Sequence, residues 1–212
     1  MSQANGDDRL VAAELLAALG QRRIGSDLVV VEEAGSTNDL VWEAEARGAP
    51  EGFVVIAEKQ TAGRGRYGRR WESAPYQGLW LSVLLRPALT LAESPQLTAL
   101  LAKTMAATIT EECGCIVSIK MPNDIYFAGR KIAGVLVEGR NGNNGSYVAV
   151  AGLGLNVNQT LDDFPEDLRQ GAGSLRMATG QPIHRAHLAA ALLRKLDANY
   201  ADLYAGLVGR NC

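Results

Sequence analysis

The chain of 212 residues has little of what marks secreted, membrane-spanning or zinc-binding proteins. Its three cysteines form no Cys-x-x-Cys pair, which argues against a disulfide framework and a zinc site and favours buried, reduced thiols. Its two histidines, His184 and His187, have no third ligand nearby in the sequence, so we expect them on the surface without a metal. No apolar run is as long as a membrane span, and the polar residues 1–9 do not resemble a signal peptide. These absences predict a cytoplasmic protein that does not enter a membrane.

An excess of positive charge is also missing. The chain has 21 Lys and Arg against 23 Asp and Glu, which gives a net charge of −2 and a pI of about 5.8. No overall positive field exists to attract a polyanion, so nonspecific nucleic-acid binding is disfavoured, although a local basic loop is compatible with this balance. The 47% of hydrophobic residues is enough for a continuous core, which excludes a largely disordered chain.

The spacing of apolar residues predicts an α+β fold with a mixed, mainly antiparallel sheet and packed helices. Helical periods predict helices over residues 8–19, 36–47, 96–112 and 184–207. Apolar runs predict strands over residues 28–31, 53–60, 79–85, 116–120, 125–127, 131–138 and 147–158. Turn residues between the last three strands, at 128–130 and 141–146, are typical of two successive hairpins.

Two of the predicted helices begin with capping signals. Ser36, with Asp39 three residues later, has the spacing of a capping box in which each side chain bonds to the other's backbone amide. Ser94 precedes Pro95, a residue that suits the first turn of a helix. We therefore expect Ser36 and Ser94 to be N-caps.

Residues 61–77 are rich in Gly, Arg and Pro and predict a long loop, which in a compact domain is usually functional or disordered. Residues 63–68 fit G-x-G-x-x-G, but the helix and the acidic residue that a dinucleotide fold needs do not follow. The glycines instead let the backbone approach an anion, while Arg64 and Arg66 offer guanidinium groups to a phosphate or carboxylate. Trp71 offers a flat face on which a base can stack.

The same loop has ordinary explanations. Arg-Gly runs are common in flexible RNA-binding segments, the side chains of Arg69 and Arg70 are compatible with simple solvation, and Trp71 is compatible with a place in the core. Taken alone, the loop supports the functional and the ordinary interpretation about equally.

Three further groups of residues accompany the loop. The segment from Lys120 to Asp124 places a cation, an amide and a carboxylate at a strand end, although Asn-Asp in a turn is usually structural. Lys131 begins an apolar strand, where it either reaches water or faces a buried anion, and Gly134 indicates a close approach or a bulge. In the last predicted strand, alternation predicts a face that suits a ligand or a tightly packed helix and carries Gly152, Gly154, Asn156 and Asn158.

Six motifs follow one another along the chain. They are Gly-Ser-Thr-Asn (35–38), Lys-Gln-Thr-Ala-Gly-Arg-Gly-Arg-x-Gly-Arg-x-Trp (59–71), Gly-Leu-Trp-Leu-Ser (78–82), Lys-x-Pro-Asn-Asp (120–124), Gly-Arg-Lys-Ile-Ala-Gly-Val-Leu-Val-Glu (129–138) and Gly-Leu-Gly-Leu-Asn-Val-Asn (152–158). In this order they closely resemble biotin protein ligases, over roughly residues 30–207. The resemblance implies the catalytic-domain fold of biotin and lipoate ligases, which is similar to that of class II synthetases.

The resemblance also implies an ATP-dependent, adenylate-forming enzyme. Such a ligase joins biotin and ATP into biotinyl-5′-AMP, releases pyrophosphate, and then transfers biotin to one lysine of a biotin carboxyl carrier protein. Mg²⁺ would arrive with ATP, held largely by phosphate oxygens. A lid must keep water from the adenylate, and the Gly/Arg loop is the segment expected to close over it.

By the same resemblance, the motif residues have expected roles. The catalytic groups would be Arg64, Lys131 and Asp124, of which Lys131 would bridge the biotin carboxylate and the α-phosphate and Asp124 would orient or deprotonate the acceptor amine. Biotin would be bound by Ser36, Thr37, Asn38, Gln60, Gly63, Arg64, Arg66, Lys131 and Gly134. Trp71 would stack on adenine, and the whole nucleotide-binding set would be Arg64, Arg66, Arg69, Trp71, Lys120, Asn123, Asp124 and Asn156.

The chain departs from the family pattern in two respects. Met121 stands where members often have tryptophan, a change expected to alter packing rather than chemistry. Residues 1–212 are expected to form a single catalytic domain, without the N-terminal DNA-binding domain or the C-terminal β-barrel of other members, so neither DNA binding nor repression is expected. The sequence leaves the metal ligands and the oligomeric state open, with a homodimer as one option.

Three other functions are compatible with parts of the pattern. An octanoyl or lipoate transferase is similar in fold, but transfer through a thioester needs a reactive cysteine, and Cys113 and Cys115 lie at the end of a predicted packing helix. A catalytically incomplete protein would hold biotinyl-AMP without turnover. An Arg/Gly-rich RNA-binding protein would retain RNA in a salt-sensitive manner. The arginine loop together with the Lys-x-Pro-Asn-Asp motif favours the biotin ligase.

Overall fold

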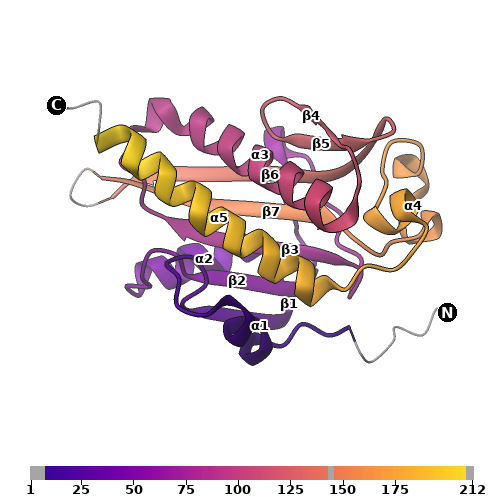
Figure 1. Cartoon of the computed structure of the whole chain (residues 1–212), viewed down its shortest axis with the longest axis horizontal. Coiled ribbons are helices and arrows are strands. Elements are labelled where there is room, and N and C mark those ends of the chain that lie inside the picture. Colours follow the sequence, from indigo (N-terminus) through magenta and orange to yellow (C-terminus); the bar gives the residue numbers. More distant parts are fainter. Residues whose placement is uncertain (1–7, 143–145, 209–212) are drawn as a thin grey trace.

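A computed structural model describes residues 8–142 and 146–208. In these residues, seven strands form one sheet in the order β1-β2-β3-β7-β6-β5-β4 (Figure 1). β1 and β2 are parallel and the other neighbouring pairs are antiparallel, which confirms the predicted mixed, mainly antiparallel sheet. The strands are β1 (Leu28–Ala34), β2 (Val54–Gln60), β3 (Gly78–Leu85), β4 (Ser118–Lys120), β5 (Asp124–Phe127), β6 (Arg130–Asn141) and β7 (Tyr147–Asn156).

Helices cover the two faces of the sheet unequally (Figure 1). α3 and α5 lie side by side across one face, where their apolar side chains and those of the central strands form the main core. α2 packs on the opposite face around a smaller cluster that includes Val41 and Leu84. The helices are α1 (Ala12–Leu19), α2 (Thr37–Ala46), α3 (Ser94–Cys113), α4 (Leu175–Thr179) and α5 (Arg185–Val208).

The four predicted helices are present, and Ser36 is the N-cap of α2 as predicted, but the capping box predicted at Ser36 and the N-cap predicted at Ser94 are wrong. α3 ends before Gly114, which adopts the left-handed conformation that favours glycine (φ 67°). Ser36 is the N-cap of α2 but makes no side-chain capping hydrogen bond. Glu93, not Ser94, is the N-cap of α3, and it closes a capping box with Thr90 one turn earlier. The sequence pattern does not predict α4, because its five residues are too few to show a helical period.

The predicted hairpins and the predicted loop are also present. β5 and β6 join through Ala128 and Gly129, both with positive φ (46° and 79°), as in a tight hairpin turn. β6 and β7 pair from Ala133 to Asn141, whereas residues 143–145 of the second turn lie outside the described part. Residues 61–77 form no strand or α-helix and contain one short 3₁₀ turn.

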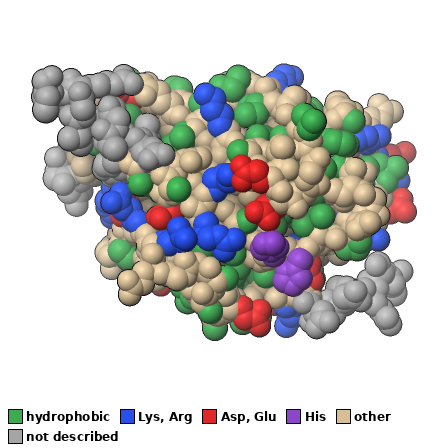
Figure 2. Space-filling model, viewed as in Figure 1, with side chains coloured by type: hydrophobic (Ala, Val, Ile, Leu, Met, Phe, Trp, Pro, Cys, Tyr) green, Lys and Arg blue, Asp and Glu red, His purple; other side chains and the backbone are tan. Residues whose placement is uncertain are grey.

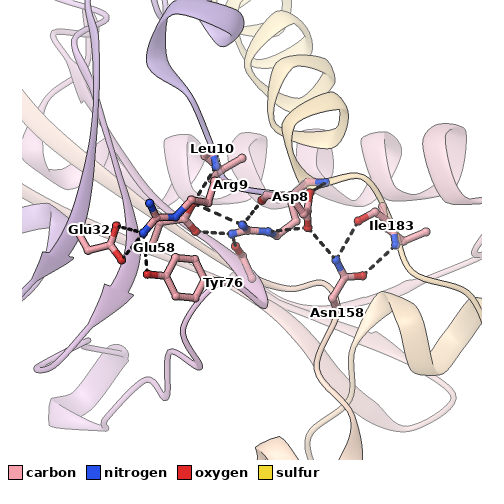
Figure 3. A network of polar contacts seen from close by, with 10 residues as sticks. Asp8, Arg9, Leu10, Glu32, Glu58, Tyr76, Asn158 and Ile183 are labelled. Atoms are coloured by element: carbon pink, nitrogen blue, oxygen red, sulfur yellow. Dashed lines mark hydrogen bonds and ion pairs between the residues drawn. The ribbon is translucent and has the colours of Figure 1, made fainter. Parts of the chain in front are cut away.

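A buried charged network ties the first described residues to the core (Figure 3). Arg185 begins α5 and is fully buried, and its guanidinium lies 3.0 Å from the Asp8 carboxylate and 2.6 Å from that of Glu58 on β2. Glu58 also accepts a hydrogen bond from the Leu10 amide, and Asp8 accepts one from Asn158, beyond the end of β7. One guanidinium therefore joins the N-terminal segment, β2 and α5.

The surface over α3 and α5 carries mixed charge, with Lys and Arg interspersed with Asp and Glu (Figure 2). The two histidines are exposed there, as predicted, and His187 Nε2 lies 3.5 Å from a carboxylate oxygen of Glu112. Among residues 8–142 and 146–208, no helix is long and apolar enough to cross a membrane.

Candidate active site

A floor of glycines lies on the α2 face of the sheet. Gly134 of β6 pairs with Gly154 of β7, and Gly152 lies two residues away on the same face. The residues that alternate with them in β7, Leu153 and Leu155, lie in the main core. The alternation predicted for β7 is therefore confirmed: the side chains on one face of the strand pack into the core, and the opposite face carries Gly152 and Gly154.

Two side chains of the protein itself cover this floor. A Cβ atom on Gly154 would lie 2.6 Å from the Trp71 indole, and one on Gly134 would lie 3.2 Å from it. A Cβ atom on Gly152 would lie 2.5 Å from Asn38 Oδ1. The glycines thus allow Trp71 and Asn38 to approach the sheet, and the expected open face is occupied by an aromatic ring from the loop and an amide from α2.

Trp71 lines two neighbouring hollows of very different size. The small hollow has a volume of about 50 Å³, and the large hollow has a volume of about 420 Å³. Residues that line both hollows, and so form a shared wall, are Gly65, Arg66, Trp71, Asn123, Asp124 and Lys131. The predicted residues that line the small hollow alone are Ser36, Thr37, Asn38, Gln60, Arg64 and Gly134. The structure therefore brings residues from all six motifs, far apart in the sequence, to one place.

Uncharged polar groups form one wall of the small hollow. Gln60 Oε1 accepts hydrogen bonds from the amide and the hydroxyl of Thr37, at 2.9 and 3.1 Å, and so caps α2 in place of Ser36. The Thr37 hydroxyl contacts Ser82 Oγ at 2.7 Å, and Ser82 donates to Asn38 Oδ1 at 2.6 Å. Asn38 is buried, and its Nδ2 has no hydrogen-bond partner among the described residues. Because a buried donor without an acceptor is costly, this amide suits the carbonyl oxygen of a ligand.

Cations and a carboxylate meet in the shared wall. Lys131 Nζ lies 2.7 Å from Asp124 Oδ1 and 5.3 Å from the ring centroid of Trp71. Asp124 Oδ1 also accepts a hydrogen bond from Asn123 Nδ2 at 2.8 Å, and Arg66 donates to Asn123 Oδ1 at 2.9 Å. These contacts join β5, β6 and the loop, and they place an ammonium and a guanidinium beside both hollows.

Arg64 binds carboxylates on the other side of the small hollow. Its guanidinium donates two hydrogen bonds to Asp39 of α2, at 2.7 and 2.8 Å, and lies 3.2 Å from Glu138 of β6. The hydrogen bonds from Arg64 lower the pKa of Asp39, and those bonds also raise the pKa of Arg64. The predicted capping box of Ser36 and Asp39 is therefore wrong, because a charged guanidinium is a stronger partner for the carboxylate than a neutral amide.

Two predicted nucleotide-binding residues line the large hollow alone. Arg69 lies there with its side chain exposed. Asn156 lies there too, but its amide is used within the protein: Nδ2 donates to the Gly173 carbonyl at 2.9 Å, and Oδ1 accepts from Gln159 at 3.2 Å. Asn156 therefore shapes this hollow as much as it offers a contact to a ligand.

Two other predicted residues, Gly63 and Lys120, line neither hollow in the described structure. Gly63 is buried, and a Cβ atom there would lie 2.6 Å from the Trp71 carbonyl oxygen. Its role here is to let the two arms of the loop pair, since its carbonyl accepts a hydrogen bond from the Trp71 amide. Lys120 is exposed at the end of β4.

Several residues of the site escape sequence prediction. Ser82 is the one hydroxyl in the apolar strand β3. A buried hydroxyl needs a hydrogen-bond partner, and this requirement is the sequence feature that could have pointed to Ser82. In the sequence, Asp39 and Glu138 have the pattern of solvent-exposed charges. Their role in the site follows only from the ion pairs that they form with Arg64 in the structure. Part of the wall of the large hollow comes from a segment without an apolar period and includes Phe164, Asp167, Leu168, Gly171 and Ala172. Tyr126 of β5 also lines it.

Comparison with known proteins agrees with this geometry. A model of the biotin/lipoate A/B protein ligase family matches residues 30–156, which is more than half of the chain and includes the whole shared wall. The chain belongs to this family. The predicted family and the predicted fold are thereby confirmed.

One relative is the bifunctional ligase/repressor BirA of Bacillus subtilis. It is 38% identical to this chain over 194 residues, which cover 92% of this chain and 60% of BirA. The biotin–[acetyl-CoA-carboxylase] ligase of Mycobacterium tuberculosis is 34% identical over 202 residues, covering 91% of this chain and 70% of that one. Among solved structures, the biotin protein ligase from Aquifex aeolicus in complex with biotin and ATP is 29% identical, with a TM-score of 0.72 over 84% of this chain and 72% of that one. The chain thus spans 60% of the length of the Bacillus relatives.

The two cysteines among the described residues, Cys113 and Cys115, lie apart from the site. Cys115 is buried in the main core, and Cys113 packs against that core at the end of α3. Burial raises the pKa of Cys113 to about 11 and also raises the pKa of Cys115. Because the thiolate is the nucleophile, both residues are poorly suited to carry an acyl group at neutral pH.

We therefore expect both thiols to react slowly with 5,5′-dithiobis(2-nitrobenzoic acid) at pH 7.5. Measured in a Cys212→Ser variant, which removes the thiol outside the described residues, labelling should be more than about tenfold slower than that of free cysteine. Labelling of either thiol as fast as free cysteine would contradict this expectation and reopen an acyltransferase with a thioester intermediate.

Proposed function

We propose that the chain is a biotin–protein ligase, which activates biotin with ATP to biotinyl-5′-AMP and then transfers biotin to a lysine of a biotin carboxyl carrier protein. The relatives named for this activity support the proposal. The single observation that carries it is the pair of hollows with a common cationic wall. Two ligands that enter these hollows would meet at Lys131 and Arg66.

The small hollow suits the ring system of biotin. A ureido group is uncharged and carries one carbonyl acceptor and two N–H donors. The unpaired Nδ2 of Asn38 supplies a buried donor for the carbonyl, and the oxygens of Ser36 and Thr37 supply acceptors. No charged group is needed at this end, and the wall that Thr37, Asn38, Gln60 and Ser82 form is uncharged.

The shared wall suits the chemistry of adenylation. A carboxylate is already a nucleophile, so the reaction needs no base, but two anions must be brought together and the growing charge at the α-phosphate must be stabilised. Lys131 and Arg66 are the two cations of this wall, and Arg66 has no carboxylate partner in residues 8–142 and 146–208. The biotin carboxylate and the α-phosphate would both lie beside Lys131.

The large hollow suits the nucleotide. Its volume of about 420 Å³ lies within the usual range for small-molecule sites, and it is open to the exposed cation Arg69. Trp71 forms part of its wall, but the indole rests on Gly154 and Gly134, so adenine would contact the side of the ring that faces the hollow. Asn156 would bound the same space.

The residues present fit Mg²⁺ as a companion of ATP rather than as a resident ion. The described residues contain no group of three His, Cys, Asp or Glu side chains placed to hold a metal. Glu72, Asp124 and Asp167 are the carboxylates that line the large hollow, where a hard cation that prefers oxygen ligands could use them. Mg²⁺ bound to the phosphates would neutralise part of their charge.

The second step, transfer to the carrier lysine, would use Asp124. An ordinary lysine has a pKa of about 10.4, so few acceptor amines are neutral at pH 7. Asp124 lines both hollows and already accepts hydrogen bonds from an ammonium and an amide. The same carboxylate would orient an incoming amine and accept its proton.

The test is exchange of labelled pyrophosphate into ATP. We expect exchange that requires biotin, because adenylation is reversible, and none when octanoate replaces biotin, because its alkyl end has no partner for Asn38 Nδ2. Exchange with octanoate alone would assign the chain to the lipoate branch. Tight binding of biotinyl-AMP without any exchange would instead show a protein that holds the adenylate and does not make it.

A further inference from the structure

Arg64, which lines the small hollow, is bound by two carboxylates. Its two hydrogen bonds to Asp39 are arranged side by side, one from each terminal nitrogen, and a third contact reaches Glu138. Paired bonds of this kind fix the plane of a guanidinium as well as its position. We call these three residues, Arg64, Asp39 and Glu138, the Arg64 clamp.

The partners of Arg64 are themselves held by rigid elements. Asp39 lies in the first turn of α2, and Trp42, three residues later on the same helix, donates from its indole nitrogen to Glu138 at 3.1 Å. Arg140 lies 4.4 Å over the Trp42 ring, which adds a second contact between β6 and α2. The clamp therefore connects the loop to α2 and to β6, which also contact each other.

The clamp lies beside the small hollow, and Arg64 is its member that lines the hollow. Asp39 follows Asn38, and Glu138 lies two residues beyond Leu136, while Arg64 itself lines the hollow from the loop side. A volume of about 50 Å³ holds a few water molecules, far less than the several hundred Å³ of usual ligand sites. The hollow as it stands is therefore smaller than a bicyclic ligand, so the loop must move for biotin to enter and to leave.

Charge distinguishes Arg64 from the other cations of the site. Two carboxylates face its one guanidinium, so an anionic ligand would have to displace a carboxylate to bind it. Arg66, two residues later, has an amide and a hydroxyl as its hydrogen-bond partners instead. Of the two arginines predicted to hold anions, Arg66 is thus placed to do so, and Arg64 is placed to hold the loop.

We infer that Asp39 and Glu138 are positioning residues that hold Arg64 beside the small hollow and set the rate at which biotin and biotinyl-AMP leave. The inference rests on the proposed function for the identity of the ligand. Its structural part, that the clamp keeps the loop closed, does not depend on any ligand.

The test is an Asp39→Asn variant compared with Glu43→Gln. The two changes remove the same charge from the same helix, but Glu43 is exposed and its ion pair is with Arg47, away from the clamp. For a half-exposed ion pair we expect Asp39→Asn to release bound biotinyl-AMP about three- to fivefold faster and to raise the KM for biotin by a similar factor. The KM for ATP and the unfolding midpoint should stay near wild type, and Glu43→Gln should change none of these values.

A second readout needs no ligand. Hydrogen exchange of the loop amides that bond across the loop, those of Gly65 and Trp71, should be about three- to fivefold faster in Asp39→Asn than in wild type and unchanged in Glu43→Gln. Unchanged loop exchange would overturn the clamp. If loop exchange is faster in Asp39→Asn but the wild-type protein binds no biotinyl-AMP, the clamp is supported and the proposed function is rejected. Faster exchange together with an unchanged release rate would show that the clamp does not control the ligand.

Discussion

Replacing Lys131 with methionine should lower the rate of biotinyl-AMP formation by about a thousandfold. A unit charge at about 4 Å from a phosphate or carboxylate oxygen, at an effective dielectric near 20, is worth about 4 kcal/mol, which corresponds to about three decades in rate. Lys131 stands in the wall that both hollows share, so its charge acts at the reacting atoms. Its loss also leaves the Asp124 carboxylate, 2.7 Å away, without its ion pair and facing two anions.

Biotin-dependent pyrophosphate exchange, at saturating ATP and biotin, measures this effect. The matched control is Lys103→Met, which removes an exposed cation on α3 across the sheet from the site. The control should keep nearly full exchange, since a charge on that face is separated from the hollows by the sheet and screened by water. A loss below tenfold in Lys131→Met would show that the cationic wall is not where the charge of the reaction develops.

Replacing Arg185 with methionine should reduce the free energy of unfolding by about 3–5 kcal/mol, because removal of one partner from a buried ion pair strands the other charge. The Arg185 side chain is 0% exposed and that of Glu58 is 4% exposed. Glu58 would keep the Leu10 amide as a partner but would lose its counter-charge (Figure 3). Asp8 would lose its ion pair with the guanidinium and keep the hydrogen bond from the backbone amide of residue 185.

Urea unfolding followed by circular dichroism measures this change. Arg194→Met, on the same helix, is the control; the Arg194 side chain makes one hydrogen bond to a carbonyl at the surface, so its loss should cost less than about 1 kcal/mol. Adding Glu58→Gln to Arg185→Met should recover part of the loss, because the stranded charge is then removed. An Arg185→Met variant within 1 kcal/mol of wild type would contradict the assigned role of this network.

Local sequence patterns are sufficient for most of the fold. β3 is a run of eight apolar or small residues buried along its whole length, and α3 ends at a glycine in the left-handed conformation. Such signals depend on neighbours within a few residues, and the fold preserves them. The capping box predicted for α2 is absent because other partners compete for the same groups: Gln60 takes the first amide of α2, and Arg64 takes Asp39. The N-cap of α3 moves to Glu93, whose side chain bonds to Thr90 in the preceding turn.

The sequence predicts which residues lie in the candidate site better than it predicts which contacts those residues make. The motifs identify Lys131, Asp124 and Asn38, and the structure gathers them around the two hollows. They do not reveal that the Trp71 indole rests on the glycines of β6 and β7, or that Arg64 turns to α2. Long side chains such as these reach several alternative partners, and only the positions of distant strands and helices select one.

The sequence by itself determined the family, the order of strands and helices, and the residue types that meet at the site, because these depend on motifs and on short-range periodicity. The tertiary structure alone decided which charges are paired. Arg64, Arg66 and Lys131 carry the same formal charge in the sequence, yet in the fold two carboxylates hold the first, an amide and a hydroxyl hold the second, and Asp124 holds the third. The strength of a charged contact depends on distance and burial, and these are properties of the folded chain rather than of its residues.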